Sequence, residues 1–473
     1  MQLKDKRATV VGLARSGIGA ANLLAKMGAR VTVTDRKTET ELSDSLRSLA
    51  PSVNRALGGH PEGIFSADLL VVSPGVPLEI EPIARAKKKG VPVIGELELA
   101  YQVLEDRQIP FLAVTGSNGK STTTTLLNDM MTRAGFRTVF GGNIGNAMTE
   151  EILRLSEFRN GTFDIRNLDY AVVEVSSFQL ESIKKFRPHV AAILNLTPDH
   201  MDRYHSLADY SGAKAQIFLN QQDADYLVLN ADDPEVMKMK DEKWEAKKKR
   251  PAIFYFSRQK EVAGLYLKDG VVLANLQDLP FSDPHFSLIH AGEIRIKGVH
   301  NLENAMAASA MALLANCPRE AVIESLREFS GLEHRLEFVR ELGGVTYIND
   351  SKGTNVGAVV KSLESFQGGV ILIAGGRDKA GDFSVLRDQV SLKVKALVLI
   401  GEAAEKIRKA LDGVTETVTA RDLREAVEMS RERAKKGDAV LLSPACASFD
   451  MFRDFEDRGR QFKKIVMDLE GHE

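Results

Sequence analysis

The stretch that decides the fold reads Pro110-Phe-Leu-Ala-Val-Thr-Gly-Ser-Asn-Gly-Lys-Ser-Thr-Thr-Thr-Thr125. A short apolar strand over residues 111–114 runs into a turn with two glycines, and we expect a helix to begin near Lys120. Such a turn lets backbone N–H groups surround an anion, and the N-terminus of the helix adds its positive end. In this layout Lys120 reaches the β- and γ-phosphates, and a hydroxyl of Ser121 or Thr122 holds Mg²⁺.

The match to a phosphate-binding loop is shorter than the full pattern, because Val114 stands where the first glycine would be. A generic turn of glycine and serine is the simpler interpretation, but it accounts neither for the Lys-Ser pair nor for the strand before it. The sequence therefore predicts an ATP site, formed by Gly116, Ser117, Asn118, Gly119, Lys120, Ser121 and Thr122.

Length and composition indicate an ordinary multidomain protein. A chain of 473 residues suggests about three domains at roughly 150 residues each. With 44% hydrophobic residues, 27% charged residues and a net charge of −2, no basic excess points to nucleic acid or to a membrane surface. The two cysteines, Cys317 and Cys446, lie far apart and are expected to be reduced thiols. A strand at residues 7–11 leaves no room for a signal peptide, and no apolar run reaches membrane-helix length, so we expect a soluble, cytoplasmic protein.

Residues 1–98 alternate between strand and helix patterns. The strand at 7–11 leads into the glycine-containing turn 12–19, and a second strand ends in Asp35. This layout is similar to a dinucleotide-binding fingerprint, although Ala14 replaces the middle glycine. An NAD site, a site for another nucleotide diphosphate and a purely structural turn all remain open. A further strand ends at Ser73-Pro74-Gly75, which is where α/β sheets bind ligands.

The central part of the chain carries polar residues after its strands. The apolar strand 170–173 ends in Glu174, the usual place for a Mg²⁺ ligand in a phosphate-loop domain, with a salt bridge at the core edge as the alternative. The strand 190–194 runs out into a segment with Asp199, His200, Asp202 and Arg203, which favours ligand or metal chemistry over packing.

Other central segments are less informative. Lys214 lies on an expected helix over 207–220 and, seen alone, is an ordinary surface lysine. Residues 150–168 have the composition of a solvated helix and loop, and 251–298 of several short strands. Asn301 and Asn304 share one helix face, where they offer amides to an adenine or cap the helix.

Four expected strands in the last third of the chain each end in polar residues. These strands are 345–348, 370–374, 396–400 and 439–442. Because parallel strands carry their carboxyl ends to one edge of a sheet, this pattern predicts a ligand cleft that faces the ATP domain.

Together these stretches resemble the Mur ligase superfamily, the ATP-dependent enzymes that extend the cell-wall precursor peptide. The resemblance covers essentially the whole chain, and its carriers are residues 115–121, 141–145, 174–181, 197–203, 300–304, 334–335, 349–352 and 443–448. Within the superfamily, the motifs at 174–181 and 443–450 are similar to those of the branch that adds D-glutamate.

The resemblance implies an α/β fold of three domains. Residues 1–98 would form a Rossmann-like domain that binds the UDP substrate, 99–331 a central P-loop ATPase-like domain, and 332–473 a Rossmann-like domain that binds the amino acid. The implied activity joins D-glutamate to UDP-N-acetylmuramoyl-L-alanine through an acyl phosphate, with release of ADP and phosphate, in peptidoglycan precursor synthesis. The enzyme would use ATP and two Mg²⁺ ions, and would act as a monomer on small molecules alone.

The resemblance also implies a role for individual residues. The catalytic set is Lys120, Asn143, Glu174, His200, Lys214 and Lys352. The metal ligands are Ser121, Glu174, His200 and Lys214, the last as a carbamate. Asn304, Arg335 and Asp350 would join the phosphate loop in binding ATP. The D-glutamate residues are His200, Thr354, Lys379, Ser448 and Phe455, among which a cation and hydroxyls suit a dicarboxylate. UDP would be held by Arg15, Ser16, Asp35, Arg36, Ser73, Pro74, Gly75 and Asn143.

Three rival interpretations remain. One is a different superfamily member, which adds L-alanine or a diamino acid or acts on folate. The second is an NAD-dependent oxidoreductase with an appended nucleotide-binding module, which would leave Lys120 without a role. The third is a nucleotide-dependent switch, which does not explain a polar cleft in the last domain.

Overall fold

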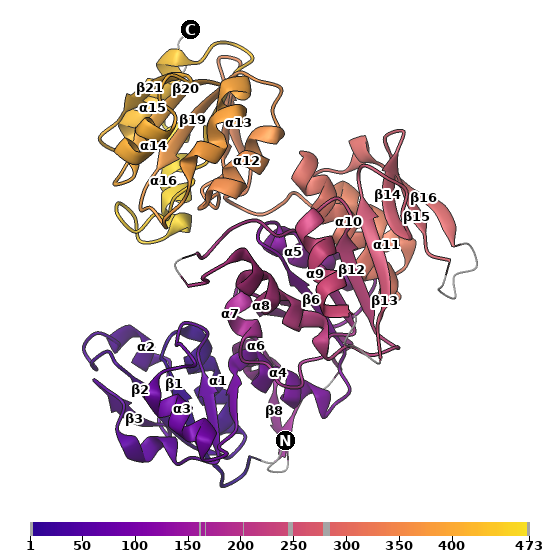
Figure 1. Ribbon diagram of the computed structural model, residues 1–473, viewed down its shortest axis with the longest axis vertical. Coiled ribbons are helices and arrows are strands. Elements are labelled where there is room, and N and C mark those ends of the chain that lie inside the picture. Colours follow the sequence, from indigo (N-terminus) through magenta and orange to yellow (C-terminus); the bar gives the residue numbers. More distant parts are fainter. Residues whose placement is uncertain are drawn as a thin grey trace.

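The computed structural model describes residues 3–159, 162–165, 167–201, 203–244, 249–277 and 284–470. It contains three α/β parts, each built around its own sheet (Figure 1). Within the described ranges, none of the helices combines the length and the apolar character that crossing a bilayer requires.

The first part is a five-stranded parallel sheet in the order β3-β2-β1-β4-β5. Its strands are β1 (Arg7–Val11), β2 (Arg30–Asp35), β3 (Asn54–Leu57), β4 (Leu69–Val72) and β5 (Val93–Gly95). Its helices are α1 (Arg15–Lys26), α2 (Ser43–Arg47), η1 (Glu62–Phe65) and α3 (Glu81–Lys88). The strand order reverses between β1 and β4, which is where sheets of this type open a crevice for a ligand.

The central part is a nine-stranded sheet in the order β16-β15-β14-β13-β12-β11-β6-β10-β7. Its strands are β6 (Phe111–Thr115), β7 (Thr138–Gly142), β10 (Tyr170–Glu174), β11 (Val190–Ile193), β12 (Tyr226–Asn230), β13 (Ala252–Ser257), β14 (Gly264–Lys268), β15 (Val271–Asn275) and β16 (His285–His290). Its helices are α4 (Glu96–Glu105), α5 (Lys120–Arg133), α6 (Met148–Leu155), α7 (Ser177–Leu180), α8 (Leu207–Leu219), α9 (Pro234–Trp244), η2 (Ala291–Glu293), α10 (Val299–Leu314) and α11 (Arg319–Glu328). A small hairpin of β8 (Glu157–Arg159) and β9 (Thr162–Asp164) stands apart.

Alternation along the central strands divides the core into two. In β6, Phe111 and Ala113 face one cluster of buried residues, whereas Leu112 and Val114 face the other. Successive side chains of a strand point to opposite faces, so the apolar run 111–114 is covered on both sides. Helices α5, α10 and α11 cover the second face. This burial explains why the run is apolar throughout.

The third part is a six-stranded sheet in the order β17-β18-β22-β19-β20-β21. Its strands are β17 (Glu337–Leu342), β18 (Val345–Asn349), β19 (Val370–Gly375), β20 (Val394–Ile400), β21 (Glu416–Thr419) and β22 (Ala439–Leu442). Its helices are α12 (Val356–Glu364), η3 (Phe383–Leu386), α13 (Arg387–Lys393), α14 (Ala404–Ala410), α15 (Leu423–Arg433) and α16 (Phe455–Met467). Strands β18, β22, β19 and β20 are parallel neighbours, as the four polar strand ends predicted.

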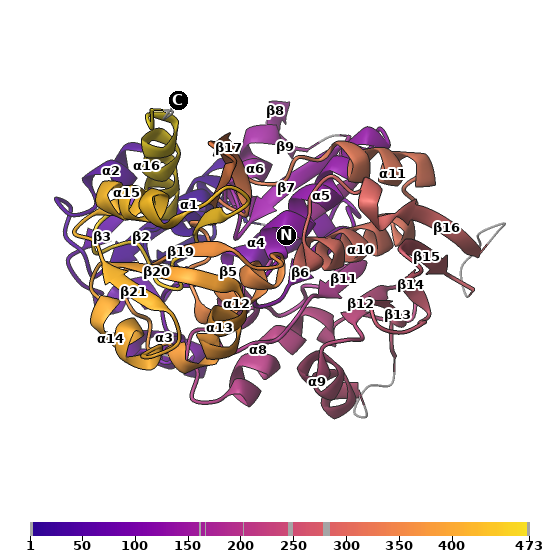
Figure 2. The same ribbon diagram turned by 90° about the horizontal axis from the view of Figure 1, so that it is seen from above.

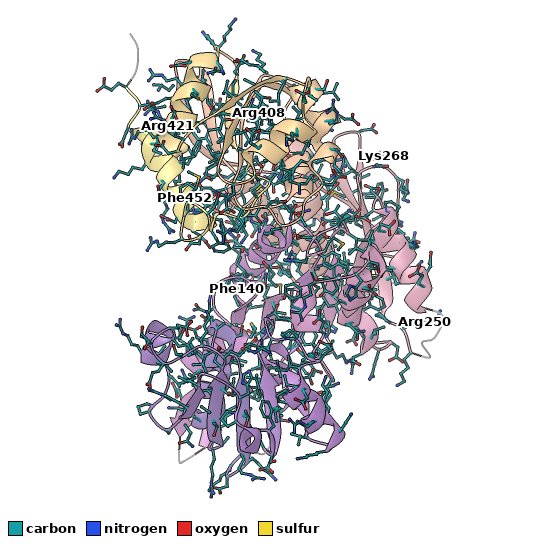
Figure 3. All side chains as sticks on the ribbon, turned by 60° about the vertical axis from the view of Figure 1, so that its left-hand side comes forward. Phe140, Arg250, Lys268, Arg408, Arg421 and Phe452 are labelled. Atoms are coloured by element: carbon teal, nitrogen blue, oxygen red, sulfur yellow. The ribbon has the colours of Figure 1, made fainter. Side chains whose placement is uncertain are left out.

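The first and third parts lie on the same side of the central part. Figure 1 shows the third part above the first, with the central sheet and helices α10 and α11 to the other side, and in Figure 2, seen from above, the third part overlaps the first. In Figure 3 the labelled Arg408 and Arg421 lie in the third part, remote from the first. Helix α1 of the first part packs on α6 of the central part, and their apolar residues belong to one continuous core.

The three-part α/β fold confirms the predicted fold class, while the boundaries after residues 98 and 331 stay predictions. One local interpretation was wrong. Residues 150–168 were expected to be solvated, but Ile152 of α6 is fully buried in the core shared with α1. Helix α6 has many charged residues, but its apolar residues form a stripe that packs on another part of the chain. Local composition alone does not predict this contact.

Candidate active site

The phosphate-binding loop has the predicted strand–turn–helix layout. Strand β6 ends at Thr115 and helix α5 begins at Lys120, with Gly119 before it at a φ of 82°. A Cβ at Gly119 would clash with the side-chain oxygen of Asn304 on α10. Glycine is therefore required there both by the left-handed backbone and by the close approach of α10.

Two lysine side chains donate hydrogen bonds to the backbone of this loop. Lys120 Nζ donates to the carbonyl oxygens of Gly116 and Ser117, both at 2.9 Å. Lys214 Nζ on α8 donates to the same Gly116 oxygen at 2.8 Å, and its ammonium lies 4.5 Å from the ring centre of Tyr210. Only 1% of Lys214 is exposed, so the interpretation of it as a surface lysine was wrong.

Burial disfavours a charge on Lys214. Removal from water lowers the pKa of Lys214 well below its ordinary value, and the charge of Lys120 lowers it further, against opposing effects of Asp199 and Glu174. The same burial lowers the pKa of Lys120, although Glu174 and Asp199 act against it. A neutral amine at Lys214 is nucleophilic, which is the state that reaction with CO₂ requires.

Glu174 ends strand β10 with one carboxylate oxygen bonded and the other not. Asn143 Nδ2 donates to Glu174 Oε1 at 2.7 Å, and the Asn143 amide donates to the Glu174 carbonyl at 2.9 Å. Oε2 is buried and receives no hydrogen bond from the residues that the structure describes. A buried anionic oxygen without a donor suits a cation, so this carboxylate fits a Mg²⁺ ion.

The protein side chains alone do not complete a metal site. Among the described residues, no three His, Cys, Asp or Glu side chains come together as a ligand set. A Mg²⁺ ion at Glu174 would thus need oxygens from phosphate, water, Ser121 or a modified Lys214, which is the usual coordination of Mg²⁺ beside nucleotides.

His200 follows strand β11 in a left-handed conformation, with a φ of 57°. Its Nε2 lies 3.8 Å from Asp199 Oδ2, and its ring packs edge-on against Phe178 with 4.8 Å between centres. Asp199 also accepts a bond of 3.3 Å from Asn355, which begins α12 of the third part. Asp202, singled out from the same motif, lies outside the described residues.

Arg335 connects the third part to the phosphate loop. It lies between two residues with left-handed backbone, His334 (φ 65°) and Leu336 (φ 43°). Its NH2 group donates to Ser121 Oγ at 2.8 Å, across the boundary between the two parts. Burial lowers the pKa of Arg335, with Glu174 and Asp350 opposing.

Asp350 and Lys352 follow strand β18. Asp350 Oδ2 accepts bonds from Ser443 Oγ (2.6 Å) and Ser362 Oγ (2.7 Å), but burial dominates and raises its pKa to about 6. Lys352 Nζ lies 3.6 Å from the ring centre of Phe455, and burial, aided by the charge of Arg335, lowers its pKa to about 8. Both groups titrate near neutral pH, as groups in functional sites often do.

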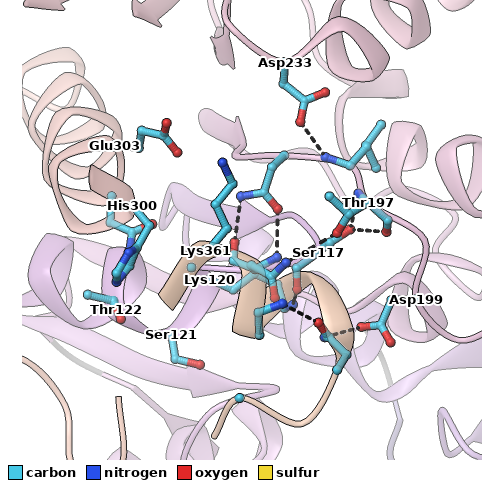
Figure 4. Close-up of a pocket in the computed structure, with 18 of the residues that line it drawn as sticks. Ser117, Lys120, Ser121, Thr122, Thr197, Asp199, Asp233, His300, Glu303 and Lys361 are labelled. Carbon is cyan, nitrogen blue, oxygen red and sulfur yellow. Dashed lines mark hydrogen bonds between the residues drawn. The ribbon is translucent and has the colours of Figure 1, made fainter. Parts of the chain in front are cut away.

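A cleft of about 530 Å³ between the central and third parts brings most of the predicted residues together (Figure 4). The predicted residues that line it are Ser117, Asn118, Gly119, Lys120, Ser121, Thr122, Asn143, Glu174, His200, Asn304, Arg335, Asp350, Lys352, Thr354 and Lys379. Gly116, Lys214, Ser448 and Phe455 do not line it. Gly116 belongs to the loop itself, Lys214 donates to its carbonyl oxygen, and Phe455 lies beside Lys352.

Sequence reasoning missed several residues that line the same cleft. Among them are Asp232, Asp233 and Arg258 near the ends of β12 and β13, and His300 and Lys361 on α10 and α12. Asp232 and Asp233 follow a buried strand just as Glu174 ends one, so the same signal would have found them. His300 is neutral because burial lowers its pKa to about 4.

The residues predicted for UDP do not share one pocket. Asp35, Arg36 and Gly75 line a separate pocket of about 150 Å³ at the carboxyl edge of the first sheet. Asn143 lines the main cleft instead, and the others make structural contacts or lie nearby. Ser73 Oγ donates to the Gly12 carbonyl at 2.8 Å, Pro74 accepts from Arg203 at 3.3 Å, Arg15 donates to the Gly145 carbonyl, and Ser16 lies in the first turn of α1.

Comparison with known families divides the chain in the same way as the sheets. Residues 6–95 match the family model "Mur ligase MurD-like, N-terminal domain", 114–312 match "Mur ligase middle domain", and 334–446 match "Mur ligase, glutamate ligase domain".

Solved structures share the fold at low sequence identity. A pseudomurein peptide ligase type C from Methanothermus fervidus superposes with a TM-score of 0.60 at 18% identity, over 98% of this chain and 100% of that one. A UDP-N-acetylmuramate-alanine ligase from Thermotoga maritima gives 0.59 at 21% identity, over 98% and 99%.

Curated relatives are much closer in sequence. Two proteins named UDP-N-acetylmuramoylalanine--D-glutamate ligase, from Geotalea daltonii and Pelotomaculum thermopropionicum, are 46% and 43% identical to the chain. The alignments cover 100% and 99% of this chain and 99% of each relative. With its three parts matched in order and its full length aligned, this chain belongs to the Mur ligase family.

Proposed function

We infer that the protein uses ATP to join D-glutamate to UDP-N-acetylmuramoyl-L-alanine, releasing ADP and phosphate, in peptidoglycan precursor synthesis. The observation that carries this inference is the cleft in which Lys120 and Glu174 of the central part meet Lys352 and Lys379 of the third part. Relatives that align over the full length carry the name of this ligase. The family is ATP-dependent, and the loop before α5 is the residue set that suits a nucleotide.

The reaction consists of two displacements. A carboxylate oxygen of the UDP substrate attacks the γ-phosphorus of ATP, and ADP leaves. The amine of D-glutamate then attacks the acyl carbon, loses a proton, and inorganic phosphate leaves as the amide forms. Each of the two steps requires that the reactants be positioned and that negative charge be neutralised. The cations Lys120 and Lys352 line the cleft and would contribute to both requirements.

We propose that two Mg²⁺ ions bind beside the phosphates, where they would neutralise the transferring phosphoryl group. Ser121 and Glu174 would hold the first, with Oε2 of Glu174 as the available oxygen. His200 and Lys214 would hold the second, Lys214 as a carbamate formed from its neutral amine. A carbamate on Lys214 would add a carboxylate to a site in which no three His, Cys, Asp or Glu side chains of the described residues come together.

For D-glutamate we propose recognition by the third part. Lys379 and Thr354 line the cleft and would bind one carboxylate through charge-assisted hydrogen bonds. Phe455 lies beside Lys352, His200 faces the same cleft from the central part, and Ser448 is proposed from the family motif that contains it. Asn304, Arg335 and Asp350 would hold the adenosine end of ATP.

Because one chain carries all of these residues, we propose that the monomer is active. Its substrates are small cytoplasmic metabolites, so we propose that it works in the cytoplasm. Light scattering during gel filtration tests the first point, and a dimer as the smallest active species would contradict it.

The decisive experiment is phosphate release from ATP with UDP-N-acetylmuramoyl-L-alanine and one amino acid at a time. Release that needs both the UDP substrate and D-glutamate supports the proposed reaction. Release with L-glutamate, L-alanine or a diamino acid instead would leave the family assignment unchanged but would contradict the proposed specificity for D-glutamate. Absence of release with every pair would overturn the proposal.

A further inference from the structure

The small pocket of the first part contains a histidine that the predicted UDP residues do not include. His60 follows a Gly58-Gly59 turn at the carboxyl end of β3. The turn is fixed against β2, because Gly58 N donates to the Lys37 carbonyl (2.9 Å) and Gly59 N to the Asp35 carbonyl (3.1 Å). Gly58 has a φ of 76°, which favours glycine, so the turn places His60 at the edge of the sheet.

The hydrogen bonds of Thr34 indicate which ring nitrogen of His60 carries the proton. Thr34 Oγ1 donates its single proton to the Gly59 carbonyl at 3.0 Å and lies 2.9 Å from His60 Nδ1. Because the Gly59 carbonyl can only accept, we assign the hydroxyl proton to that bond and the ring hydrogen to Nδ1, which then donates to Thr34. In the neutral ring, Nε2 is then an acceptor.

The same contact orients the ring. Thr34 is fully buried in the sheet, and the Nδ1 edge of His60 is turned toward it. Because Nδ1 is engaged by Thr34, Nε2 is the ring nitrogen left for a ligand in the pocket that His60 lines. None of the residues that the structure describes forms a hydrogen bond with Nε2.

The pocket has the size and character for a pyrimidine ring. Its volume is about 150 Å³, and Val76, Pro77 and Ile80 give it an apolar wall. Asp35, which also lines the pocket, accepts hydrogen bonds from the amides of Leu13 (2.7 Å) and Lys37 (2.9 Å) through its two oxygens. A flat base can thus lie against the apolar wall with its polar edge toward His60.

We propose that Nε2 of His60 accepts the N3–H of uracil, and that His60 thereby selects the uridine form of the substrate. Uracil presents a donor at N3, whereas cytosine presents an acceptor at the same atom, so an acceptor-only nitrogen distinguishes them. Thr34 is a positioning residue, because it holds the proton on Nδ1. This inference rests on the proposed function only in taking a UDP-linked substrate.

Charge around the ring is consistent with this role. Burial lowers the pKa of His60, and the nearby Arg36 lowers it further, while Asp35 acts in the opposite direction. The neutral ring therefore persists at physiological pH, with Nε2 free of a proton.

Calorimetric titration of the full-length protein with UDP and with CDP tests the proposal. We expect wild type to prefer UDP, and His60→Ala to lose about tenfold in UDP affinity, the worth of one hydrogen bond, with little change for CDP. Thr34→Val should lower UDP affinity less, since it touches no ligand. His285→Ala, on β16 of the central part, is the matched control and should bind both nucleotides as wild type does.

Equal affinities of wild type and His60→Ala for UDP, or equal losses for both nucleotides, would overturn the proposal. A further probe needs no variant: N3-methyl-UDP should bind wild type about tenfold more weakly than UDP does, and wild-type affinity for it would count against His60. Phosphate release separates this inference from the proposed function. UDP binding that depends on His60 without ligation of D-glutamate would refute the ligase function alone, and ligation with UDP binding insensitive to His60 would refute this inference alone.

Discussion

Lys120 and Lys214 donate to one and the same backbone oxygen, the carbonyl of Gly116, at 2.9 and 2.8 Å. Burial lowers the pKa of both lysines, and the charge of Lys120 lowers the pKa of Lys214 further. The conflict is resolved most simply if Lys120 keeps its charge for the phosphates and Lys214 gives up its proton. The phosphate loop and Lys214 are therefore electrostatically coupled at Gly116.

Replacement of Lys120 by alanine should lower the ligation rate by about 10²- to 10³-fold, the loss typical for a removed charge-stabilising donor. The fold should survive, because the loop is held by other bonds, such as that of the Asn118 amide to Asn195 Oδ1 at 2.8 Å. Phosphate release and circular dichroism check the two statements. Lys268→Ala, at the end of β14, is the control and should behave as wild type. Wild-type turnover in Lys120→Ala would refute a phosphate-binding role.

Lys214→Arg and Lys214→Met should both lose most activity, because neither side chain can form a carbamate. Arginine keeps a positive charge and methionine does not. Comparison of the two variants therefore distinguishes a need for positive charge from a need for the carbamate. Wild type freed of CO₂ should lose activity and regain it on addition of bicarbonate, whereas the two variants should not respond. Retained activity in Lys214→Arg would show that a cation suffices at this position.

For Lys352 we expect a pH effect on kcat/KM, which reports ionisations of the free enzyme. Its pKa is lowered to about 8 by burial and by Arg335, so its positive charge is present below about pH 8 and lost above. Activity that needs this cation should fall as the pH rises through 8. In Lys352→Arg the fall should disappear, because arginine stays charged throughout. If kcat/KM of Lys352→Arg still falls at alkaline pH as in wild type, the fall is due to the ionisation of another group.

Asp350 should make the protein less stable above pH 6. Its pKa in the folded state is raised from 3.8 to about 6, so the folded protein binds more protons than the unfolded chain between these values. Stability relative to Asp350→Asn should therefore rise as pH falls from 6 toward 4, by an amount on the order of 3 kcal/mol. Melting temperatures of the two proteins across this range provide the measurement. A difference in melting temperature that does not change with pH would contradict a raised pKa of the buried Asp350 carboxyl.

Closure of the third part onto the central part should accompany substrate binding, because the residues proposed for ATP and those proposed for D-glutamate come from both sides of the cleft. The bonds from Arg335 to Ser121 and from Asn355 to Asp199 already cross the cleft. Small-angle scattering should show a smaller radius of gyration with an unreactive ATP analogue and the UDP substrate present. Identical profiles with and without ligands would argue for a rigid arrangement.

Much of the fold was predictable because its signals are local. The apolar runs of β1, β4, β6, β10 and β22 and the glycine turns after them predicted parallel sheets and the edge at which ligands bind. Glu174 and Asp350 were found by this rule, since each stands at the end of a buried strand. The specific reaction came from resemblance, because strand ends indicate a cleft but not its substrate.

The residues that sequence reasoning misjudged depend on contacts between distant segments. Lys214 has the sequence context of a surface helix and is buried only because α8 packs beneath a loop 98 positions earlier. Ile152 became a core residue through contact with α1. His60 gave a weak local signal, a Gly-Gly turn after a strand, and its importance appears only beside Thr34.

The continuous core that joins α1 to α6 has a consequence for how the protein melts. Apolar side chains from β1 in the first part and from β6 in the central part belong to one buried cluster, whereas the two clusters of the third part contain only residues from 336 onward. Cooperative units follow shared cores rather than functional boundaries. The three parts of the chain thus form two cooperative units, and damage to the sheet of the first part should destabilise the central sheet before it affects the third part.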